Sequence, residues 1–219
     1  MNDYQIAFID LALSRGALRF GRFTLKSGRE SPYFFNAGLL SDGEAMAGLG
    51  RCYAAALAAA DLPFDMLFGP AYKGIPLVTA TAIALAERHH RNVPYAFDRK
   101  ETKAHGEGGR LVGSPLAGRV VVVDDVISDG TAKRESIELI RAAGAEPAGV
   151  LLALDREERG AAERSAVEEL RQRYGIPCVS VITLGQLVEA LASAPGEAAR
   201  ISAEQLTSLK RYRERYGVG

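Results

Sequence analysis

Four consecutive valines, at positions 120–123, are the strongest structural signal in this sequence. A strand that is apolar at every position must be covered on both faces, as the central strands of parallel sheets are. Further short apolar segments predict strands at 65–69, 93–97, 148–154 and 177–182. Helical patterns between them predict helices at 74–88, 131–143 and 161–174. Strands and helices that alternate in this way predict an α/β fold with a central parallel sheet flanked by helices.

The two ends of the chain interrupt this alternation. Near the N-terminus the pattern predicts a helix at 2–14, followed by two strands at 18–25 and 33–37 around the turn 26–29. The segment 202–216 has the pattern of a charged helix with a few apolar residues on its inner face. We therefore expect a small accessory layer, here called the hood, to lie over the main sheet.

The length of 219 residues fits one domain with a substantial core. No internal repeat or long linker divides the chain. We expect a single domain over residues 1–219, in which about residues 1–40 contribute to the hood and about residues 62–185 form the core sheet.

Composition excludes several classes of protein. The 27 Lys and Arg residues balance 27 Asp and Glu residues, so the overall charge attracts neither nucleic acid nor an anionic membrane. The longest nearly apolar stretches, 52–60 and 75–86, are shorter than the roughly 18 residues of a membrane-spanning helix. Cys52 and Cys178 have no zinc-binding spacing, so we expect reduced thiols. With no secretory signal readable at residues 1–4, we expect a cytoplasmic protein without nucleic-acid or membrane partners.

Two carboxylates follow the valine strand directly. Asp124 and Asp125 stand at its carboxyl end, where open α/β sheets bind ligands. Adjacent carboxylates can accept hydrogen bonds from two sugar hydroxyls or contact a hydrated magnesium ion. The next turn, Ser128 to Thr131, offers backbone N–H groups, hydroxyls and a helix N-terminus to an anion. Together these groups predict a site for ribose 5-phosphate.

Other interpretations of this motif are weaker. An aspartate pair after an apolar strand also resembles a Walker B element, but the chain contains no G-x-x-x-x-G-K-[ST] sequence. No G-x-G-x-x-G sequence follows a predicted strand, so a dinucleotide site lacks its fingerprint. Any one aspartate here could simply cap the following helix, but that explanation does not account for the whole group.

The segment 98–118 is rich in glycine and carries five basic side chains without an aromatic residue, namely Arg99, Lys100, Lys103, His105 and Arg110. A long segment without regular structure is uncommon inside a compact domain and is usually functional or disordered. We expect a lid that closes over an anionic ligand, the alternative being a tolerated flexible insertion.

Residues 121–132 resemble the signature by which type I phosphoribosyltransferases bind 5-phospho-α-D-ribose 1-diphosphate (PRPP). Other segments narrow the resemblance to the orotate phosphoribosyltransferases. They are similar to the hood (23–29 and 31–36), the pyrophosphate-binding turn (69–74) and the catalytic loop (99–109) of those enzymes. Asp129 departs from the family pattern, which usually has a small residue there. An extra carboxylate would weaken binding of the 5-phosphate unless its side chain points outward.

The resemblance implies the type I phosphoribosyltransferase fold and a reaction. Ribose 5-phosphate would move from PRPP to orotate, giving orotidine 5′-phosphate and diphosphate, in de novo pyrimidine biosynthesis. Mg²⁺ is the implied cofactor, held mostly by substrate and water, with Asp124 and Asp125 as the candidate protein contacts. The implied active unit is a homodimer with shared sites, because the family's loop residues, here Arg99, Lys103 and His105, reach into the neighbouring subunit.

The family motifs also assign ligands residue by residue. PRPP would be bound by Lys26, Tyr72, Lys73, Arg99, Lys100, Lys103, His105, Asp124, Asp125, Val126, Ile127, Ser128, Asp129, Gly130, Thr131 and Ala132. The catalytic residues among these would be Lys103 and Asp125, and orotate would be bound by Phe34, Phe35, Ser128 and Arg156. On residue type alone, the two phenylalanines would instead be core residues.

Two alternative functions are compatible with a PRPP signature. A purine or uracil phosphoribosyltransferase is one, against which Phe34, Phe35 and Arg156 argue. The other is a regulator that binds PRPP without catalysis and reads DNA through a basic added domain. The zero net charge, together with Lys103 and His105 in the loop, argues against such a regulator.

Overall fold

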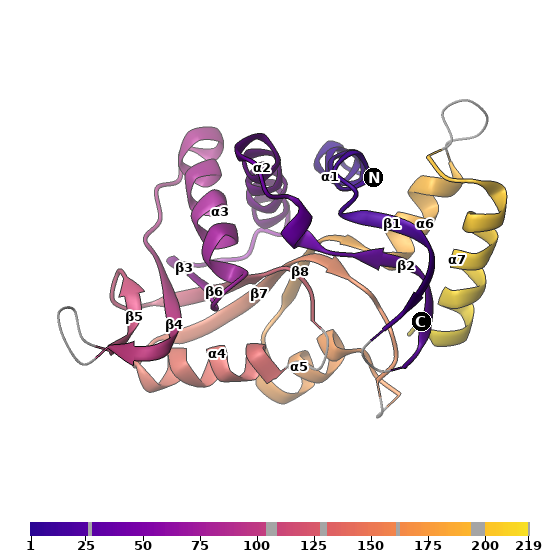
Figure 1. The fold of residues 1–219 in the computed structure, drawn as a ribbon. Helices are drawn as coiled ribbons and strands as arrows, with labels where there is room; N and C mark the ends of the chain where they lie inside the picture. The colour runs from indigo at the N-terminus through magenta and orange to yellow at the C-terminus, as the bar shows by residue number, and fades with distance from the viewer. Residues whose placement is uncertain (26–27, 104–108, 128–130, 161–162, 194–199, 219) are drawn as a thin grey trace.

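The computed structural model describes residues 1–25, 28–103, 109–127, 131–160, 163–193 and 200–218 (Figure 1). Its central sheet has six strands in the order β5-β4-β3-β6-β7-β8. They are β3 (Met66–Gly69), β4 (Tyr95–Lys103), β5 (Gly109–Gly113), β6 (Arg119–Asp124), β7 (Glu146–Asp155) and β8 (Cys178–Thr183). β5 is antiparallel to β4, and the other neighbouring strands are parallel. The predicted α/β fold with a central parallel sheet is confirmed, with the antiparallel edge strand β5 as an addition that was not predicted.

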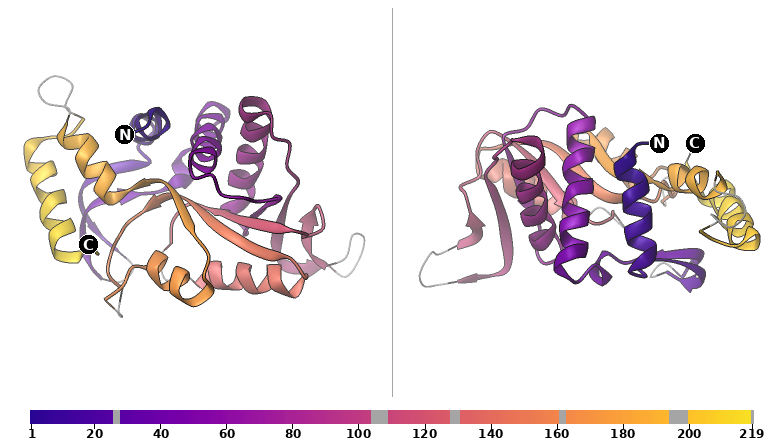
Figure 2. Two further views of the ribbon diagram at one scale, coloured as in Figure 1. Left: turned by 180° about the vertical axis from the view of Figure 1, so that it is seen from behind. Right: turned by 90° about the horizontal axis from the view of Figure 1, so that it is seen from above.

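Helices cover both faces of this sheet, as Figures 1 and 2 show. One face carries α1 (Asp3–Ser14), α2 (Gly43–Ala59) and α3 (Gly74–His89), and the other carries α4 (Thr131–Ala142) and α5 (Ala166–Tyr174). The valines of β6 alternate between the two cores, because successive side chains of a strand point to opposite faces. All of them are fully buried, which explains the uninterrupted apolar run.

The hood contains a separate antiparallel sheet of two strands, β1 (Leu18–Thr24) and β2 (Glu30–Phe35). The short 3₁₀ helix η1 (Ala37–Leu39) connects it to α2. Two helices follow β8 and lie beside the hood at the same end of the molecule (Figures 1 and 2), namely α6 (Leu184–Ala192) and α7 (Ala203–Tyr216). Helix α7 packs against β2, and the rings of Tyr212 and Tyr33 meet edge-on with centroids 6.0 Å apart. The C-terminal helix therefore supports the strand that carries Tyr33, Phe34 and Phe35.

The sequence pattern does not predict α2 or α6. Helix α2 buries residues around much of its circumference, so the apolar period that marks an amphipathic helix is weak in it. Helix α6 is amphipathic, but it spans only nine residues, which is a short stretch in which to recognise that period. Helix α5 begins at Ala166 and not at 161, because Ser165 and Glu168 form a capping box at that point. The remaining predicted helices and strands are present, with boundaries that shift by a few residues.

The segment 98–118, predicted to lack regular structure, contains the two strands of a β-hairpin. β4 continues to Lys103 and pairs with β5 in antiparallel register. Asp98 on β4 is buried and forms an ion pair with Arg110 on β5, with 3.2 Å between Oδ2 and Nη2. The expectation of a structureless segment is therefore wrong for these strands, whereas residues 104–108 lie outside the described residues.

Two further observations bear on the expectations from composition. Cys52 and Cys178 are both free, and burial raises the pKa of their thiols to about 11 and about 12. Both thiols are therefore protonated and unreactive at neutral pH. Within the described ranges, no helix combines the length and the apolar character needed to cross a bilayer.

Candidate active site

Asp124 ends the central strand β6 and Asp125 follows it, and both carboxylates are buried. Each holds the loop that leaves the strand, because Asp124 Oδ1 accepts a hydrogen bond from the Asp125 N–H (2.9 Å) and Asp125 Oδ1 accepts one from the Val126 N–H (2.8 Å). The main chain is fixed as well, since Tyr53 Oη donates to the Asp124 carbonyl at 2.9 Å and the Ala153 N–H donates to the Asp125 carbonyl at 2.9 Å. The paired carboxylates are therefore preorganised without a ligand.

A lysine neutralises each of these carboxylates. Lys73, from the turn after β3, places Nζ 2.6 Å from Asp125 Oδ2. Lys133, from the first turn of α4, places Nζ 2.5 Å from Asp124 Oδ2 and 2.6 Å from the carbonyl oxygen of Val126. Burial raises the pKa of Asp124, and the ammonium of Lys133 opposes that shift. Lys133 is buried, whereas the Lys73 side chain is 57% exposed and remains accessible to a ligand.

We expect Lys133→Met to lower the free energy of unfolding by about 3–5 kcal/mol, because it leaves Asp124 buried without its cation. Urea unfolding at neutral pH measures this loss. The double variant Lys133→Met/Asp124→Asn removes the orphaned charge and should recover most of the stability. A loss below about 1 kcal/mol in the single variant would show that the pair contributes little to the fold.

A tight turn joins β3 to α3 beside the carboxylates. It begins at Gly69, where a Cβ atom would lie 2.3 Å from the carbonyl oxygen of Gly74, so only glycine fits. The Ala71 N–H donates to Asp98 Oδ1 at 2.6 Å, which ties the turn to the base of the β4–β5 hairpin. Tyr72 is exposed to solvent, and Lys73 reaches across to β6. The turn thus presents a cation and a helix N-terminus next to the paired carboxylates.

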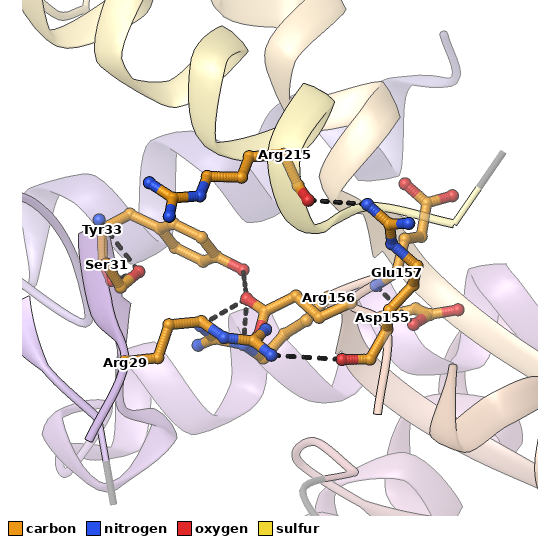
Figure 3. Close-up of polar contacts among 9 residues, drawn as sticks. Arg29, Ser31, Tyr33, Asp155, Arg156, Glu157 and Arg215 are labelled. Atoms are coloured by element: carbon orange, nitrogen blue, oxygen red, sulfur yellow. Dashed lines mark hydrogen bonds and ion pairs between the residues drawn. The ribbon is translucent and has the colours of Figure 1, made fainter. Parts of the chain in front are cut away.

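A second polar cluster lies where the hood meets the end of β7. Figure 3 shows Arg29, Tyr33 and Arg156 converging there. Arg156 donates from Nε (2.9 Å) and Nη2 (2.6 Å) to Oε1 of Glu158, and its guanidinium lies 4.6 Å from the centroid of the Tyr33 ring. The Arg156 side chain is only 16% exposed. A guanidinium held in this way is suited to binding a carboxylate.

The two phenylalanines of β2 differ in what they offer a ligand. Phe34 is half-buried and stacks on Phe23, with ring centroids 5.5 Å apart and Arg19 over both rings. Phe35 is buried and packs on Phe8 in the core. The ring of Phe35 is therefore a core side chain, and only its backbone is available for a ligand.

The structure describes the other residues that were predicted to bind a ligand in different detail. On β4, Arg99 is half-buried and Lys100 is exposed, and in the loop after β6 Val126 is half-buried and Ile127 is buried. The structure describes only the backbone of Lys103, Thr131 and Ala132, at the end of β4 and the start of α4. Outside the described residues lie Lys26, His105, Ser128, Asp129 and Gly130.

Asp124 and Asp125 are the described residues best suited to contact a metal ion. One oxygen of each pairs with a lysine and the other with a backbone N–H, so the lone pairs that remain can accept from sugar hydroxyls or from metal-bound water. In the part of the chain that the structure describes, no three His, Cys, Asp or Glu side chains gather to ligate a metal. The donor set fits a magnesium ion that is bound mainly by its substrate and by water.

Sequence reasoning missed Lys133 and Glu158. A lysine in the first turn of a helix is unfavourable, because the helix dipole places positive charge there. The position of Lys133 could therefore have indicated that its ammonium has a specific acceptor. Glu158 stands two residues after Arg156, a spacing that puts side chains on the same side of an extended segment. Its contact with Arg29 of the hood, 129 residues away along the chain, cannot be predicted from any local sequence pattern.

The comparisons with known proteins agree with one another. Residues 40–175 match the phosphoribosyl transferase domain family. The chain is 58% identical over 218 residues to an orotate phosphoribosyltransferase of Klebsiella pneumoniae (strain 342) and 57% identical to one of Pseudomonas putida (strain W619), with 100% of each chain covered. It is similar in structure to orotate phosphoribosyltransferase of Francisella tularensis, with a TM-score of 0.85 and 40% identity over 96% of this chain and 99% of that one. The resemblance predicted from the motifs is confirmed, and this chain belongs to the orotate phosphoribosyltransferases.

Proposed function

We propose that the protein transfers ribose 5-phosphate from PRPP to orotate, giving orotidine 5′-phosphate and diphosphate, in pyrimidine biosynthesis. One observation carries the proposal. Three adjacent parallel strands, β3, β6 and β7, end at the same edge of the sheet, and a different functional group follows each of them. Those groups are the turn with Lys73, the carboxylates Asp124 and Asp125, and the arginine Arg156. They suit a diphosphate, a ribose diol and an anionic base in turn.

The ribose 5-phosphate half of PRPP would bind at the end of β6. Asp124 and Asp125 would accept hydrogen bonds from the ribose hydroxyls, while Val126 and Ile127 precede residues 128–130 and the N-terminus of α4. Backbone N–H groups there favour a phosphate. Lys73 and Lys133 cancel the charge of the two carboxylates, which lowers the cost of bringing an anion close to them.

Breaking the bond at the anomeric carbon leaves negative charge on the diphosphate. Lys73 and three cations of β4, namely Arg99, Lys100 and Lys103, would bind and stabilise this leaving group together with His105. Magnesium, when bound, supplies further neutralisation of the diphosphate, with Asp124 and Asp125 as its candidate contacts through water.

The base would lie toward the hood. Arg156 would pair with the carboxylate of orotate, Phe34 would contact its ring, and Ser128 with the Phe35 backbone would fix its edge. Orotate carries an acidic ring N–H and can enter already ionised, so no protein general base is required.

We also propose a homodimer in which the β4–β5 hairpin acts as a lid over the partner's site. Tyr72 and Ile83 support it, because Tyr72, in the turn before α3, is 69% exposed, and Ile83, on α3, is 53% exposed. Large exposed side chains of this kind suit a subunit contact next to the diphosphate turn. From the sequence we also propose one domain, with a hood at about residues 1–40 over a core at about residues 62–185. We further propose that the enzyme is cytoplasmic.

Loss of orotate absorbance tests the proposed reaction. We expect absorbance to fall only when enzyme, PRPP and magnesium are all present, and uracil and hypoxanthine to be poor substitutes. A protein that consumes uracil or hypoxanthine faster than orotate is a different phosphoribosyltransferase. A protein that binds PRPP and consumes no base would be a binding protein and not an enzyme.

A further inference from the structure

One carboxylate joins the hood to the end of β7. Glu158 Oε1 accepts hydrogen bonds from both Nε and Nη2 of Arg156, at 2.9 and 2.6 Å, and from Tyr33 Oη at 3.2 Å. Its other oxygen, Oε2, pairs with Nη1 of Arg29 at 3.3 Å. Burial raises the pKa of the Tyr33 phenol, which therefore stays protonated and donates. The Glu158 side chain is 14% exposed, so these contacts form in a largely dry environment.

The charges of this cluster do not cancel. Arg29 and Arg156 carry two positive charges, and Glu158 carries one negative charge, which leaves one positive charge in excess. Glu158 occupies the Nε–Nη2 edge of the Arg156 guanidinium and leaves Nη1 without an acceptor among the described residues. The cluster is therefore built to accept one more anion, and the free edge of Arg156 is where that anion would bind.

The backbone around Glu158 is held by the C-terminal end of the chain. The Arg159 N–H donates to the Tyr216 carbonyl and the Val218 N–H to the Glu157 carbonyl, both at 2.8 Å. The Arg159 side chain also donates to the Arg215 carbonyl at 2.6 Å. The C-terminal residues thus fix the main chain on both sides of Glu158, which fixes where its carboxylate points.

We propose that Glu158 is a positioning residue for the base: it holds the guanidinium of Arg156 in the orientation that receives the carboxylate of orotate. The inference rests on the proposed function and goes beyond it, because Glu158 would set specificity without touching the substrate. A guanidinium already held in its binding orientation loses less entropy when the ligand arrives. Without Glu158, Arg156 would keep its charge, but its guanidinium would no longer be held in one orientation.

The test compares Glu158→Gln with Glu163→Gln. The second residue is a matched control, because its side chain is 80% exposed and it pairs only at the surface with Arg159. We expect Glu158→Gln to raise the KM for orotate about tenfold or more, since a buried charge-assisted hydrogen bond is lost. The KM for PRPP should change less than twofold, and Glu163→Gln should change neither.

Two more variants keep the test decisive. Tyr33→Phe removes only the hydroxyl that donates to Glu158, and we expect a smaller rise in the orotate KM of about two- to fivefold in a protein that folds normally. In the Arg156→Ala background, Glu158→Gln should add less than about a twofold change, because a residue that acts through Arg156 has nothing left to orient.

A parallel rise in the KM for orotate and for PRPP, or an additive effect in the Arg156→Ala background, would overturn the role of Glu158. So would an unchanged orotate KM in a folded Glu158→Gln protein. Failure of the proposed function itself has a separate signature, because the unmodified protein would then consume no orotate.

Discussion

Lys103→Ala and Asp125→Asn are each expected to be nearly inactive and to regain about a quarter of the wild-type activity when their subunits are mixed. Each single change should reduce kcat at least about 100-fold, because it removes a group placed at the leaving diphosphate or the ribose. If the hairpin acts on the partner's site, a mixed dimer combines both defects in one site and leaves the other intact. Half of the dimers are then mixed, and each has one working site.

The mixing experiment needs proof that subunits exchange. Mass-distinct labels on the two variants show the mixed dimer directly, and each variant incubated with itself gives the background. Mixed dimers without recovered activity would show that Lys103 serves the site of its own subunit. A protein that stays monomeric at assay concentrations would contradict the shared site altogether.

The parts of the site that could be predicted are contiguous in the sequence. The strand β6, its terminal carboxylates Asp124 and Asp125 and the helix that follows form one short stretch. An apolar run predicts a central strand, and ligands bind at the carboxyl end of such a strand. The polar residues at that end then indicate which class of ligand binds. Local chemistry alone carried this inference, and the structure bears out the placement of the two carboxylates at the end of β6.

The parts that could not be predicted depend on which strands become neighbours. Lys73 meets Asp125 because β3 lies next to β6, although the two residues are 52 positions apart. Arg29 meets Glu158 because α7 holds the hood against the end of β7, and no periodic pattern encodes that contact. The extension of β4 beyond residue 97 and the edge strand β5 were missed for a related reason: polar residues such as Asp98 and Arg110 pair across the two strands, and no apolar pattern marks them.

We expect the wild-type enzyme to prefer orotate over uracil by roughly 10⁴-fold or more. Arg156→Ala should lower this preference by a factor of about 10² to 10³. Orotate differs from uracil by one carboxylate, so a site that pairs this charge rejects a base that leaves the arginine unpaired. Without Arg156, the cluster around Glu158 loses its excess positive charge, and the cation that remains, Arg29, is paired with Glu158. The KM for orotate should therefore rise sharply.

The comparison of both substrates in the same variant separates a base ligand from a phosphate ligand. The KM for PRPP should stay within about twofold in Arg156→Ala, because the groups proposed for its phosphates, Lys73 and the helix N-terminus at Thr131, lie on other elements. Arg156→Lys should fall between the wild type and the alanine variant, since an ammonium keeps the charge and cannot form the paired hydrogen bonds of a guanidinium. If Arg156→Ala keeps its preference for orotate and loses PRPP binding, then Arg156 serves the phosphates. Glu158 would in that case orient a phosphate ligand, and the base would have to be recognised by the hood and Ser128 without a cation.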